Sequence, residues 1–340
     1  MKQYLLPESG TFYKANLHCH TNLTDGKLTP EEVKQYYKER GYAIVAYTDH
    51  ELLFPMNHLA DETFLPLNGV ELSVNEKERF DPTGKKVHLG CIALEPDNHF
   101  TPCYHRETYF VGNAQENRNL AKPVPGLPDF EREYSAAGIN AIIAEAKRLG
   151  FFVTYNHPKW SMETEADYTR YEGLDAMEIC NYACLTMGYE DYNPEVYDAF
   201  LRRGTPLYCI AADDNHNHKA SDSRYWDSFG AFTMIKAEKL EYRAVTHALT
   251  QGHFYASQGP EIYELYYEDG EVHLKCSPVE KIILTTARRR RKLLWAERGE
   301  SLAEGSLSIH PEDVYFRITV IDHTGRPANT HAYFLDSINL

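Results

Sequence analysis

Long apolar runs are missing from the sequence. No stretch of its 340 residues approaches the ~20 consecutive apolar residues that a membrane-spanning helix needs. Residues 1–14 also lack the apolar core of a secretory signal peptide. Hydrophobic residues make up 43% of the chain and charged residues 25%, as in ordinary globular proteins. We therefore expect a cytoplasmic protein without a membrane partner, and the length predicts about two domains.

Basic residues are few relative to acidic ones. Lys and Arg total 35 against 50 Asp and Glu, so the formal net charge is −15. Binding of long nucleic acid needs a basic surface, so we expect no such partner. The run ARRRRKLLW at 287–295 is the exception, and it predicts an exposed hairpin or a strand edge protected by charge. The acidic balance suits a protein that binds cations.

Paired cysteine motifs and motifs for a covalent nucleophile are also missing. The seven cysteines are odd in number, and Cys91, Cys180 and Cys209 lie inside apolar runs. We expect buried, reduced thiols, as in a cytoplasmic protein. Neither G-x-S-x-G nor a phosphate-binding P-loop occurs. These absences fit chemistry that uses no covalent nucleophile.

Short apolar runs recur along the first three quarters of the chain, each followed by a helical pattern or a loop. Near-continuous runs of this kind are typical of parallel strands covered on both faces. The runs are YAIVAYTDH (42–50), FLPLNGVEL (64–72), VHLGCIAL (87–94), FFVTYNHP (151–158), LDAMEICN (174–181), PLYCIAADDNH (206–216) and FGAFTMI (229–235). Helix signals lie between them, such as Thr29-Pro30-Glu31-Glu32 with a stop at Gly41. Repeated strand–helix units predict a closed or nearly closed β/α barrel.

Two regions depart from this rhythm. Residues 95–137 form a long polar segment, which predicts either a functional lid or a disordered excursion. Towards the C-terminus, alternating strands such as EVHLKCS, EKIILTTA, VYFRITVID and HAYFLD indicate a small antiparallel, sandwich-like β domain. We therefore predict an α/β barrel at residues 1–257, with an insertion at about 95–137, and an all-β domain at residues 258–340.

Two histidines one residue apart stand near the start of the chain, in ANLHCHTNLTDG. Residues i and i+2 of a strand share a face, so His18 and His20 would point the same way. Two imidazoles aimed at one point form half of a metal site, although a lone H-x-H also occurs on solvated strand faces. The ends of the other strands decide between these two interpretations.

Most of the strand-like runs end in a side chain that can bind a metal. The carboxyl ends of barrel strands converge on one face, where active sites are built. Together with His88 at the start of its run and Asp25 in a loop, the candidate ligands are His18, His20, Asp25, His50, Glu71, His88, His157, Asp214 and His216. Pro158 predicts extended backbone at His157. Coincidence over five strand ends is hard to defend, so the pattern predicts a metal centre.

The order of these motifs resembles the PHP family, named after polymerase and histidinol phosphatase. H-x-H-T is followed by TDG, TDH, GVE, a lone histidine, NHP and D-x-H over residues 14–235. The C-terminal β domain, preceded by FYASQGPEIYEL, resembles the appendage of a PHP subgroup of metal-dependent phosphoesterases. The resemblance implies a distorted, TIM-like (β/α)7 barrel that holds two or three divalent ions.

The resemblance also implies how the ligands divide among the ions. One ion would be held by His18, His20, Glu71 and Asp214; Glu71 would bridge to a second ion held also by His88 and His157; Asp25, His50 and His216 would hold a third. Asp25 stands where some relatives have histidine, so the number of ions stays at two or three.

Two further aspartates and the metal itself remain to be assigned. Asp214 alone forms D-x-H with His216, so Asp213 is the second choice as a ligand. Asp49 would orient a ligand histidine. Mixed imidazole and carboxylate ligands suit zinc, manganese or iron, and the sequence does not choose among them.

These features predict a metal-dependent phosphoesterase whose partner is a small phosphomonoester. Two ions can stabilise both the attacking and the leaving oxygen, and a metal-bound hydroxide would attack phosphorus directly. The predicted substrate contacts are Lys159, Arg224 and Arg118, with Arg106 as a further cation of the insertion. The oligomeric state does not follow from the sequence.

Three alternatives remain open. An amidohydrolase-like barrel also begins with H-x-H and ends with an aspartate, but it commonly has a bridging lysine where this chain has Glu71. The same metal site could instead cleave carboxylic or carbamate esters. A non-enzymatic, metal-loaded binding module would keep its biological effect after loss of a ligand such as His20.

Overall fold

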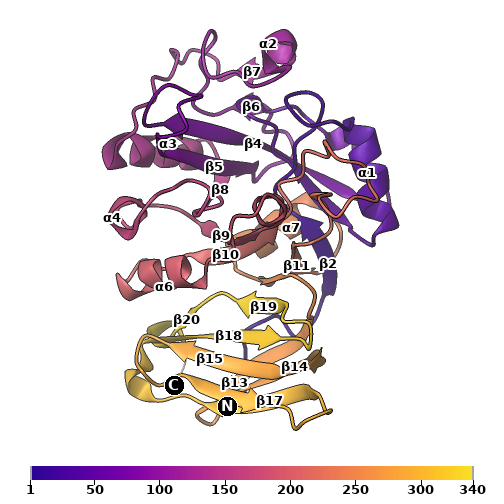
Figure 1. The fold of residues 1–340 in the computed structure, drawn as a ribbon, viewed down its shortest axis with the longest axis vertical. Coiled ribbons are helices and arrows are strands. Elements are labelled where there is room, and N and C mark those ends of the chain that lie inside the picture. The colour runs from indigo at the N-terminus through magenta and orange to yellow at the C-terminus, as the bar shows by residue number, and fades with distance from the viewer. Residues whose placement is uncertain (1, 339–340) are drawn as a thin grey trace.

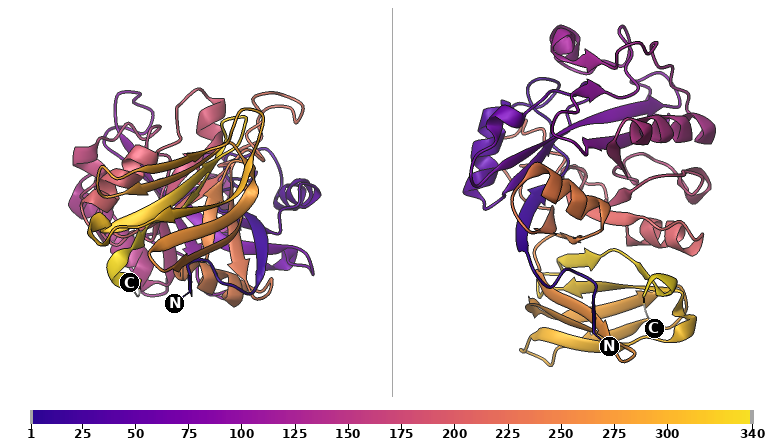
Figure 2. Two further views of the ribbon diagram at one scale, coloured as in Figure 1. Left: turned by 90° about the horizontal axis from the view of Figure 1, so that it is seen from below. Right: turned by 180° about the vertical axis from the view of Figure 1, so that it is seen from behind.

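The computed structural model describes residues 2–338, in which a mixed α/β region adjoins a region made of strands (Figure 1). Both ends of the chain lie in the all-β region (Figure 2). The helices are α1 (Pro30–Glu39), α2 (Ala114–Asn117), α3 (Ala136–Arg148), α4 (Glu165–Tyr168), α5 (Tyr182–Thr186), α6 (Pro194–Arg202) and α7 (Tyr242–Thr250). The 3₁₀ turns are η1 (Asn57–Leu59), η2 (Arg118–Leu120), η3 (Pro311–Asp313) and η4 (Leu335–Ser337).

The strands belong to three groups. The α/β region holds β2 (Thr11–Asn16), β3 (Ile44–Tyr47), β4 (Leu65–Asn75), β5 (Lys86–Ala93), β8 (Phe151–Tyr155), β9 (Ala176–Asn181), β10 (Tyr208–Ala212), β11 (Phe232–Ala237) and β12 (Phe254–Ser257). The all-β region holds β1 (Gln3–Tyr4), β13 (Ile262–Glu268), β14 (Glu271–Val279), β15 (Lys281–Thr286), β16 (Lys292–Trp295), β17 (Leu302–Ser308), β18 (Tyr315–Ile321), β19 (Pro327–Thr330) and β20 (Tyr333–Phe334). The short pair β6 (Phe100–Thr101) and β7 (Lys122–Pro123) lies in the insertion.

One 14-stranded sheet runs through both regions, in the order β10-β9-β8-β5-β4-β3-β2-β11-β12-β19-β18-β15-β16, with β20 beside β18. Strands β3 and β10 are far apart in this order. Nevertheless Ile44 of β3 and Ile210 of β10 belong to one buried cluster, together with Phe152 of β8 and Val245 of α7. The sheet therefore curves around a shared core.

The two ends of the curved part meet without forming a strand pair. The Thr233 hydroxyl of β11 accepts from the Ala211 backbone N–H of β10 at 3.2 Å and donates to its carbonyl at 3.0 Å. Among the described residues no backbone pairing joins β10 to β11. The predicted mixed α/β fold with a separate all-β sheet is confirmed, whereas a closed barrel is not shown.

The prediction of parallel strands is wrong at β5 and β11. Strand β5 runs antiparallel to β4 and β8, and β11 runs antiparallel to β2. A hairpin joins β4 to β5, because the chain returns after a turn too short for a parallel crossover. The start of β5 therefore lies where β4 ends, and His88 lies opposite Ser73. This reversal explains why His88 begins its apolar run whereas other candidate ligands end theirs.

Helix α1 begins where the local signals predict. The Thr29 hydroxyl accepts from the Glu32 backbone N–H at 3.2 Å, and the Glu32 carboxylate accepts from the Thr29 N–H at 2.8 Å. Pro30 occupies the first helical position, and Val33 and Tyr37 are buried. This start anchors the end of the loop 21–28, which carries Asp25.

The all-β region consists of two sheets packed face to face. Leu265 and Leu274 of the sheet β1-β13-β14-β17 share a buried cluster with Ile282 and Ile318 of the large sheet. Strand β1, from the start of the chain, pairs with β13. The predicted antiparallel strands are present, and the division at residues 257 and 258 stays a prediction.

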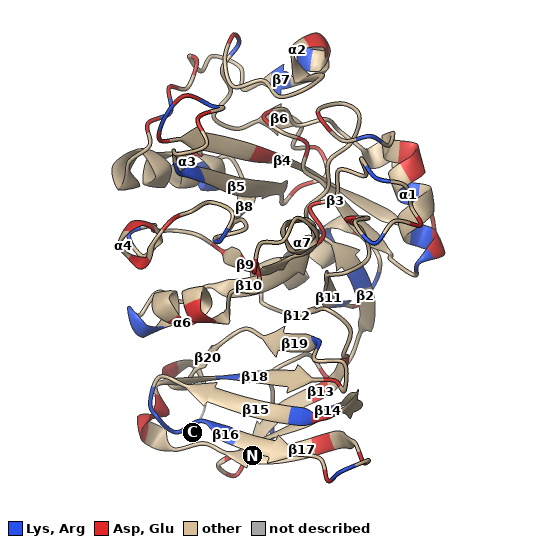
Figure 3. Ribbon diagram, viewed as in Figure 1, with Lys and Arg blue, Asp and Glu red and all other residues tan. Residues whose placement is uncertain are grey.

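Residues 95–135 cover the end of the α/β region that lies away from the all-β region (Figure 1). Within residues 2–338 no helix is long and apolar enough to cross a membrane. All seven cysteines are free and buried, as predicted. The basic run leads into β16, which is the last strand of its sheet, also as predicted. Elsewhere acidic and basic residues are interspersed over both regions (Figure 3).

Candidate metal centre

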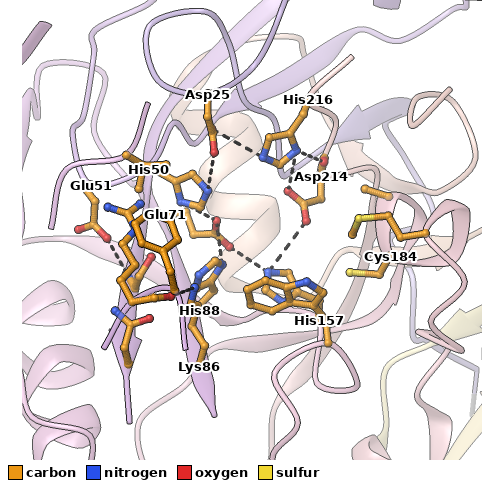
Figure 4. Close-up of a pocket in the computed structure, with 18 of the residues that line it drawn as sticks. Asp25, His50, Glu51, Glu71, Lys86, His88, His157, Cys184, Asp214 and His216 are labelled. Atoms are coloured by element: carbon orange, nitrogen blue, oxygen red, sulfur yellow. Dashed lines mark hydrogen bonds and ion pairs between the residues drawn. The ribbon is translucent and has the colours of Figure 1, made fainter. Parts of the chain in front are cut away.

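The candidate ligands come together at one end of the curved sheet, and Glu71 of β4 lies at their centre (Figure 4). The carboxylate oxygen Oε1 of Glu71 lies 3.1 Å from His18 Nε2 and 3.3 Å from His157 Nε2. The other oxygen, Oε2, lies 3.2 Å from Nδ1 of both His50 and His88. One buried carboxylate therefore faces imidazoles from four separate segments.

Asp214 lies beside the H-x-H pair. Its Oδ1 is 3.1 Å from His18 Nε2 and 3.0 Å from His20 Nε2. The two imidazole nitrogens are themselves 3.0 Å apart. His18 and His20 therefore point the same way, as their i, i+2 spacing predicts.

Asp25 lies at the outer side of the cluster. Its carboxylate is 3.5 Å from His50 Nε2, 3.7 Å from His216 Nε2 and 3.8 Å from His20 Nδ1. Three groups of ligand atoms, each with all atoms within 4.8 Å of one another, result from these contacts: His18, His20, Glu71 and Asp214; His50, Glu71 and His88; His20, Asp25, His50 and His216. The structure thus brings every predicted ligand into one cluster. The second group contains His50 where the resemblance implied His157, which contacts Glu71 but belongs to none of the three groups.

Two of the candidate ligands have strained backbone. His157 has φ of +30° and Asp214 has φ of +54°, in the left-handed region that ordinary residues avoid. The predicted extended backbone at His157 is therefore wrong. Its N–H donates to Glu178 Oε2 at 3.0 Å, which holds the turn in spite of Pro158. Strain of this kind concentrates at functional sites.

Glu178 of β9 is a side chain of the candidate site that the sequence interpretation missed. It is fully buried, and its Oε1 accepts from His18 Nδ1–H at 2.7 Å. The Asn181 amide donates to Glu178 at 2.9 Å and to Asp214 at 3.1 Å. The Asn156 amide likewise donates to Glu71 at 2.7 Å. The sequence signal that could have revealed Glu178 is that its carboxylate stands inside the apolar run LDAMEICN.

The two neighbouring aspartates have different partners. Asp213 accepts from the backbone N–H groups of residues 229–231 and from the Tyr37 hydroxyl. None of these partners is a candidate ligand, so Asp213 stabilises the fold. Asp49 accepts from the Thr21 N–H at 2.9 Å and from the Thr24 hydroxyl at 2.6 Å. Asp49 thus holds the loop that carries Asp25, and orientation of a histidine by Asp49 stays a prediction.

The charges of the cluster stabilise one another. Burial would raise the pKa of Glu71, but the facing imidazoles of His18 and His88 outweigh it and hold the pKa well below its usual range. Burial opposes the charged form of His18, yet the carboxylates of Asp214, Glu71 and Glu178 raise its pKa. Burial, with His20 nearby, lowers the pKa of His50. Metals bind ionised carboxylates and neutral imidazoles, so binding of an ion at His18 would release the proton that the neighbouring carboxylates favour.

A cavity of about 1030 Å³ opens over the cluster. Its basic lining residues are Lys77, Arg79, Lys86, Arg132 and Lys219. Lys86 stands two residues before His88 on β5 and therefore on the same face. Its ammonium lies 5.5 Å from the ring centre of Trp160, a residue whose ring packs against His88 and His157.

The predicted substrate contacts lie outside this lining. Lys159 is exposed and pairs with Glu195 at 2.8 Å, and Arg224 and Arg118 are also exposed. Arg106 pairs with Asp129 at 2.7 Å. A role for these cations in substrate binding stays a prediction. Lys86 could have been identified from the sequence, because it stands two residues before His88 and therefore shares the same face of the strand.

The residues present fit divalent metal ions. Several buried atoms of the cluster lie close together without the geometry of a hydrogen bond: Nδ1 of His50 and His88 at 3.2 Å from Oε2 of Glu71, and Oδ1 of Asp214 at 3.0–3.1 Å from Nε2 of His18 and His20. A buried polar atom left unpaired costs about 1–3 kcal/mol. These close contacts are explained if the atoms coordinate ions between them. Nitrogen and carboxylate donors suit zinc, manganese or iron.

Comparison with known proteins gives likenesses of structure. No family model and no curated protein matches the chain. One similar solved structure is a "two-domain protein containing predicted PHP-like metal-dependent phosphoesterase" from Bacteroides vulgatus, 14% identical, covering 98% of this chain and 97% of that chain with a TM-score of 0.46.

Another similar structure is an amidohydrolase from Chromobacterium violaceum with bound sulfate and no metal. It is 17% identical, covers 59% of this chain and 87% of that chain, and has a TM-score of 0.40. Both likenesses are distant. Support for a function therefore comes from the ligand groups of this chain.

Proposed function

We propose that the chain is a metal-dependent phosphoesterase that hydrolyses a small phosphate monoester. The observation that carries the proposal is the set of three ligand groups joined through shared residues, with Glu71 in two of them and His50 in two. These groups lie at the base of a cavity with basic residues in its wall. Adjacent cation sites beneath a basic wall suit a phosphoryl group, which carries charge on several oxygens.

Divalent ions bound here would supply stabilisation of negative charge on the phosphoryl oxygens and would lower the pKa of water. The chain itself supplies the orientation of the ligands. Glu178 accepts from His18 Nδ1–H, so that Nε2 of His18 is left free to face Glu71 and Asp214. Asn156 donates to Glu71 and fixes the rotation of this shared carboxylate.

Lys86 is the residue that we assign to the phosphate. Burial lowers the pKa of its ammonium, and Glu71 opposes that effect, so Lys86 lies within the field of the cluster. It donates to the Arg79 carbonyl at 3.2 Å, which leaves further N–H donors for a ligand. A cation held beside the ligand groups can bind a phosphate oxygen and exclude uncharged competitors.

No covalent nucleophile is needed in this proposal. Cys184 lines the cavity, but burial raises the pKa of its thiol well above the usual value. The thiol is therefore protonated and unreactive. We also propose a cytoplasmic location, which the seven free, buried thiols support.

The test is hydrolysis of small substrates by purified protein supplied with manganese or zinc. Phosphate release from p-nitrophenyl phosphate and a panel of small phosphomonoesters should be detectable and should cease after chelation. His20→Ala should lower the rate by more than about 100-fold, since even outer partners of ligands cost about 10–100-fold. His58→Ala is the matched control, because His58 is an exposed histidine on η1.

Parallel assays with p-nitrophenyl acetate and simple amides separate this proposal from its alternatives. Metal-dependent cleavage of an ester or amide without phosphate release would contradict phosphoesterase activity while keeping the metal site. A biological effect that survives His20→Ala would indicate a binding module instead.

A further inference from the structure

A segment of the insertion connects the cavity wall to the loop that carries Asp25. We call residues 109–117 the strap. Tyr109 and Val111 of the strap line the cavity, and α2 forms its far end. In Figure 1 α2 lies at the outer end of the molecule, above the α/β region. The contacts at both ends of the strap show what it holds.

At one end, the strap binds three successive carbonyls of the loop. The Asn113 backbone N–H donates to the Thr24 carbonyl at 2.7 Å, and its side-chain amide donates to the Asn22 carbonyl at 2.9 Å. The Asn117 amide donates to the Leu23 carbonyl at 2.9 Å. These are the three residues directly before Asp25. Paired carbonyls fix the path of the backbone here.

Gly112 lets the strap approach the loop this closely. Its φ is +52°, a conformation that favours glycine. A Cβ at this position would collide with the Thr24 carbonyl oxygen and would lie 3.0 Å from Cα of Asp25. Because the obstacle is backbone, no side-chain rotation could relieve the contact. A residue larger than glycine would therefore displace the Asp25 loop or the strap.

At the other end, the strap is fixed to the cavity wall. The Arg79 guanidinium donates to the Phe110 carbonyl. The Arg132 backbone N–H donates to the Tyr109 hydroxyl at 3.1 Å, and the Arg132 guanidinium binds the carboxylate of Glu51 and the carbonyl of Ser73 on β4. The strap therefore spans from β4, which carries Glu71, to the loop that carries Asp25.

The loop has a second support on its opposite side. Asp49 accepts from the Thr21 N–H, the Thr21 hydroxyl and the Thr24 hydroxyl. The Asp25 side chain itself is 28% exposed, far more than the other carboxylates of the cluster. Its contacts with the histidines, at 3.5–3.8 Å, are longer than the 3.2 Å contacts of Glu71 with His50 and His88. The position of Asp25 thus depends on how its loop is held.

From this geometry we infer that the strap is a positioning device for Asp25. Gly112, Asn113 and Asn117 hold the loop so that the Asp25 carboxylate completes the ligand group with His50 and His216. The inference rests on the metal site of the proposed function. The inference gives the insertion a role in the binding of one ion of the cluster. Binding of the ions held through His18 and His88 does not depend on the strap.

The test measures metal content and affinity in strap variants. Asp25→Asn defines the ion that depends on Asp25. Asn113→Ala, and the milder Asn117→Ala in case the first variant does not fold, should weaken binding of that same ion roughly 10- to 100-fold and leave the others bound. Asn140→Ala is the control, because the Asn140 amide also joins two segments through a backbone carbonyl, that of Arg170, outside the cavity lining. Elemental analysis and metal titration give the readout, with thermal unfolding alongside.

The outcomes separate this inference from the proposed function. Loss of one ion that Asp25→Asn also loses, with Asn140→Ala unchanged, supports the strap as a positioning device. Full metal content and unaltered affinity in both strap variants would overturn it. Loss of all ions together with a lowered unfolding temperature would also overturn it, since the strap would then only support the fold. A wild-type protein that binds no metal would instead refute the proposed function.

Discussion

His18 donates through Nδ1–H to the Glu178 carboxylate at 2.7 Å, and both side chains are buried. The histidine reaches the cluster with its other nitrogen, Nε2. The carboxylate therefore fixes both the tautomer and the direction of the imidazole ring. The direction in which His18 faces the candidate ligand groups therefore depends on a residue that does not itself belong to them.

Glu178→Gln should lower metal affinity roughly 10- to 100-fold without removing a ligand, because it removes the charge that orients His18. Titration with manganese or zinc measures the effect. Glu163→Gln is the matched control, since Glu163 is a carboxylate that accepts from Tyr134 and Tyr155 rather than from a ligand. Equal affinities for wild type and Glu178→Gln would contradict the orienting role.

Lys86→Met should lower kcat/KM for a phosphomonoester about 10- to 100-fold, because a hydrogen bond between charged groups is worth about 1.5–3 kcal/mol. Metal content should not change, since Lys86 is not among the ligand groups. Lys159→Met keeps the same chemistry at an exposed lysine paired with Glu195 and should have no effect. If Lys159→Met were the damaging change, the original sequence prediction would be right and the cavity assignment wrong.

Removal of one partner of the ion pair between Arg317 of β18 and Asp198 of α6 should strongly destabilise the fold. The Arg317 guanidinium donates to both Asp198 oxygens, at 2.8 and 3.1 Å, and both side chains are buried. Asp198→Ala should cost about 3–5 kcal/mol in the free energy of unfolding, because it leaves a buried charge unpaired.

Urea unfolding of two variants separates loss of the pair from loss of one partner. The double variant Asp198→Leu with Arg317→Met removes both charges and should unfold at a higher urea concentration than Asp198→Ala. A double variant less stable than the single one would show that the pair contributes more than the relief of an unpaired charge.

His331 should make the folded protein sensitive to acid. Its ring is buried against Tyr208 and Tyr333, and burial lowers its pKa to about 3, with His253 acting in the same direction. In the unfolded chain the pKa is about 6.5. Below pH 6.5 the unfolded state therefore binds a proton that the folded state does not bind. The free energy of unfolding falls as the pH is lowered from 6.5 to about 3.

The measurement compares wild type and His331→Phe by urea unfolding between pH 7 and pH 4.5, both with chelator so that metal release does not contribute. The wild type should lose up to about 1.4 kcal/mol more per pH unit than the variant in this range. Parallel pH profiles would mean that His331 is protonated in the folded protein.

Much of this structure follows from short-range signals. The capping residues at Thr29 and Pro30 set the start of α1, and apolar runs mark the strands. The clustering of the candidate ligands could be predicted, because histidines and carboxylates at the ends of several strands are expected to converge on one face of the sheet. Periodicity also placed His18 and His20 on one side.

Other features depend on contacts that a single sequence does not display. The direction of β5 depends on its pairing with β4 and β8, and an apolar run reads the same in either direction. The left-handed backbone of His157 depends on a hydrogen bond to Glu178, which lies on another strand. The contacts of Gly112 and Asn113 with the loop that carries Asp25 join segments that lie about ninety positions apart in the sequence.

The central claim is that the cluster around Glu71 holds metal ions that act in phosphate ester hydrolysis. The most direct measurement is the metal content of purified protein by plasma mass spectrometry, for wild type and Glu71→Ala, each paired with its rate of phosphate release. We predict two or three ions per wild-type chain, and fewer ions with no phosphate release in Glu71→Ala, because Glu71 takes part in two ligand groups. A wild-type protein with no bound metal, and none taken up on reconstitution, would contradict the account.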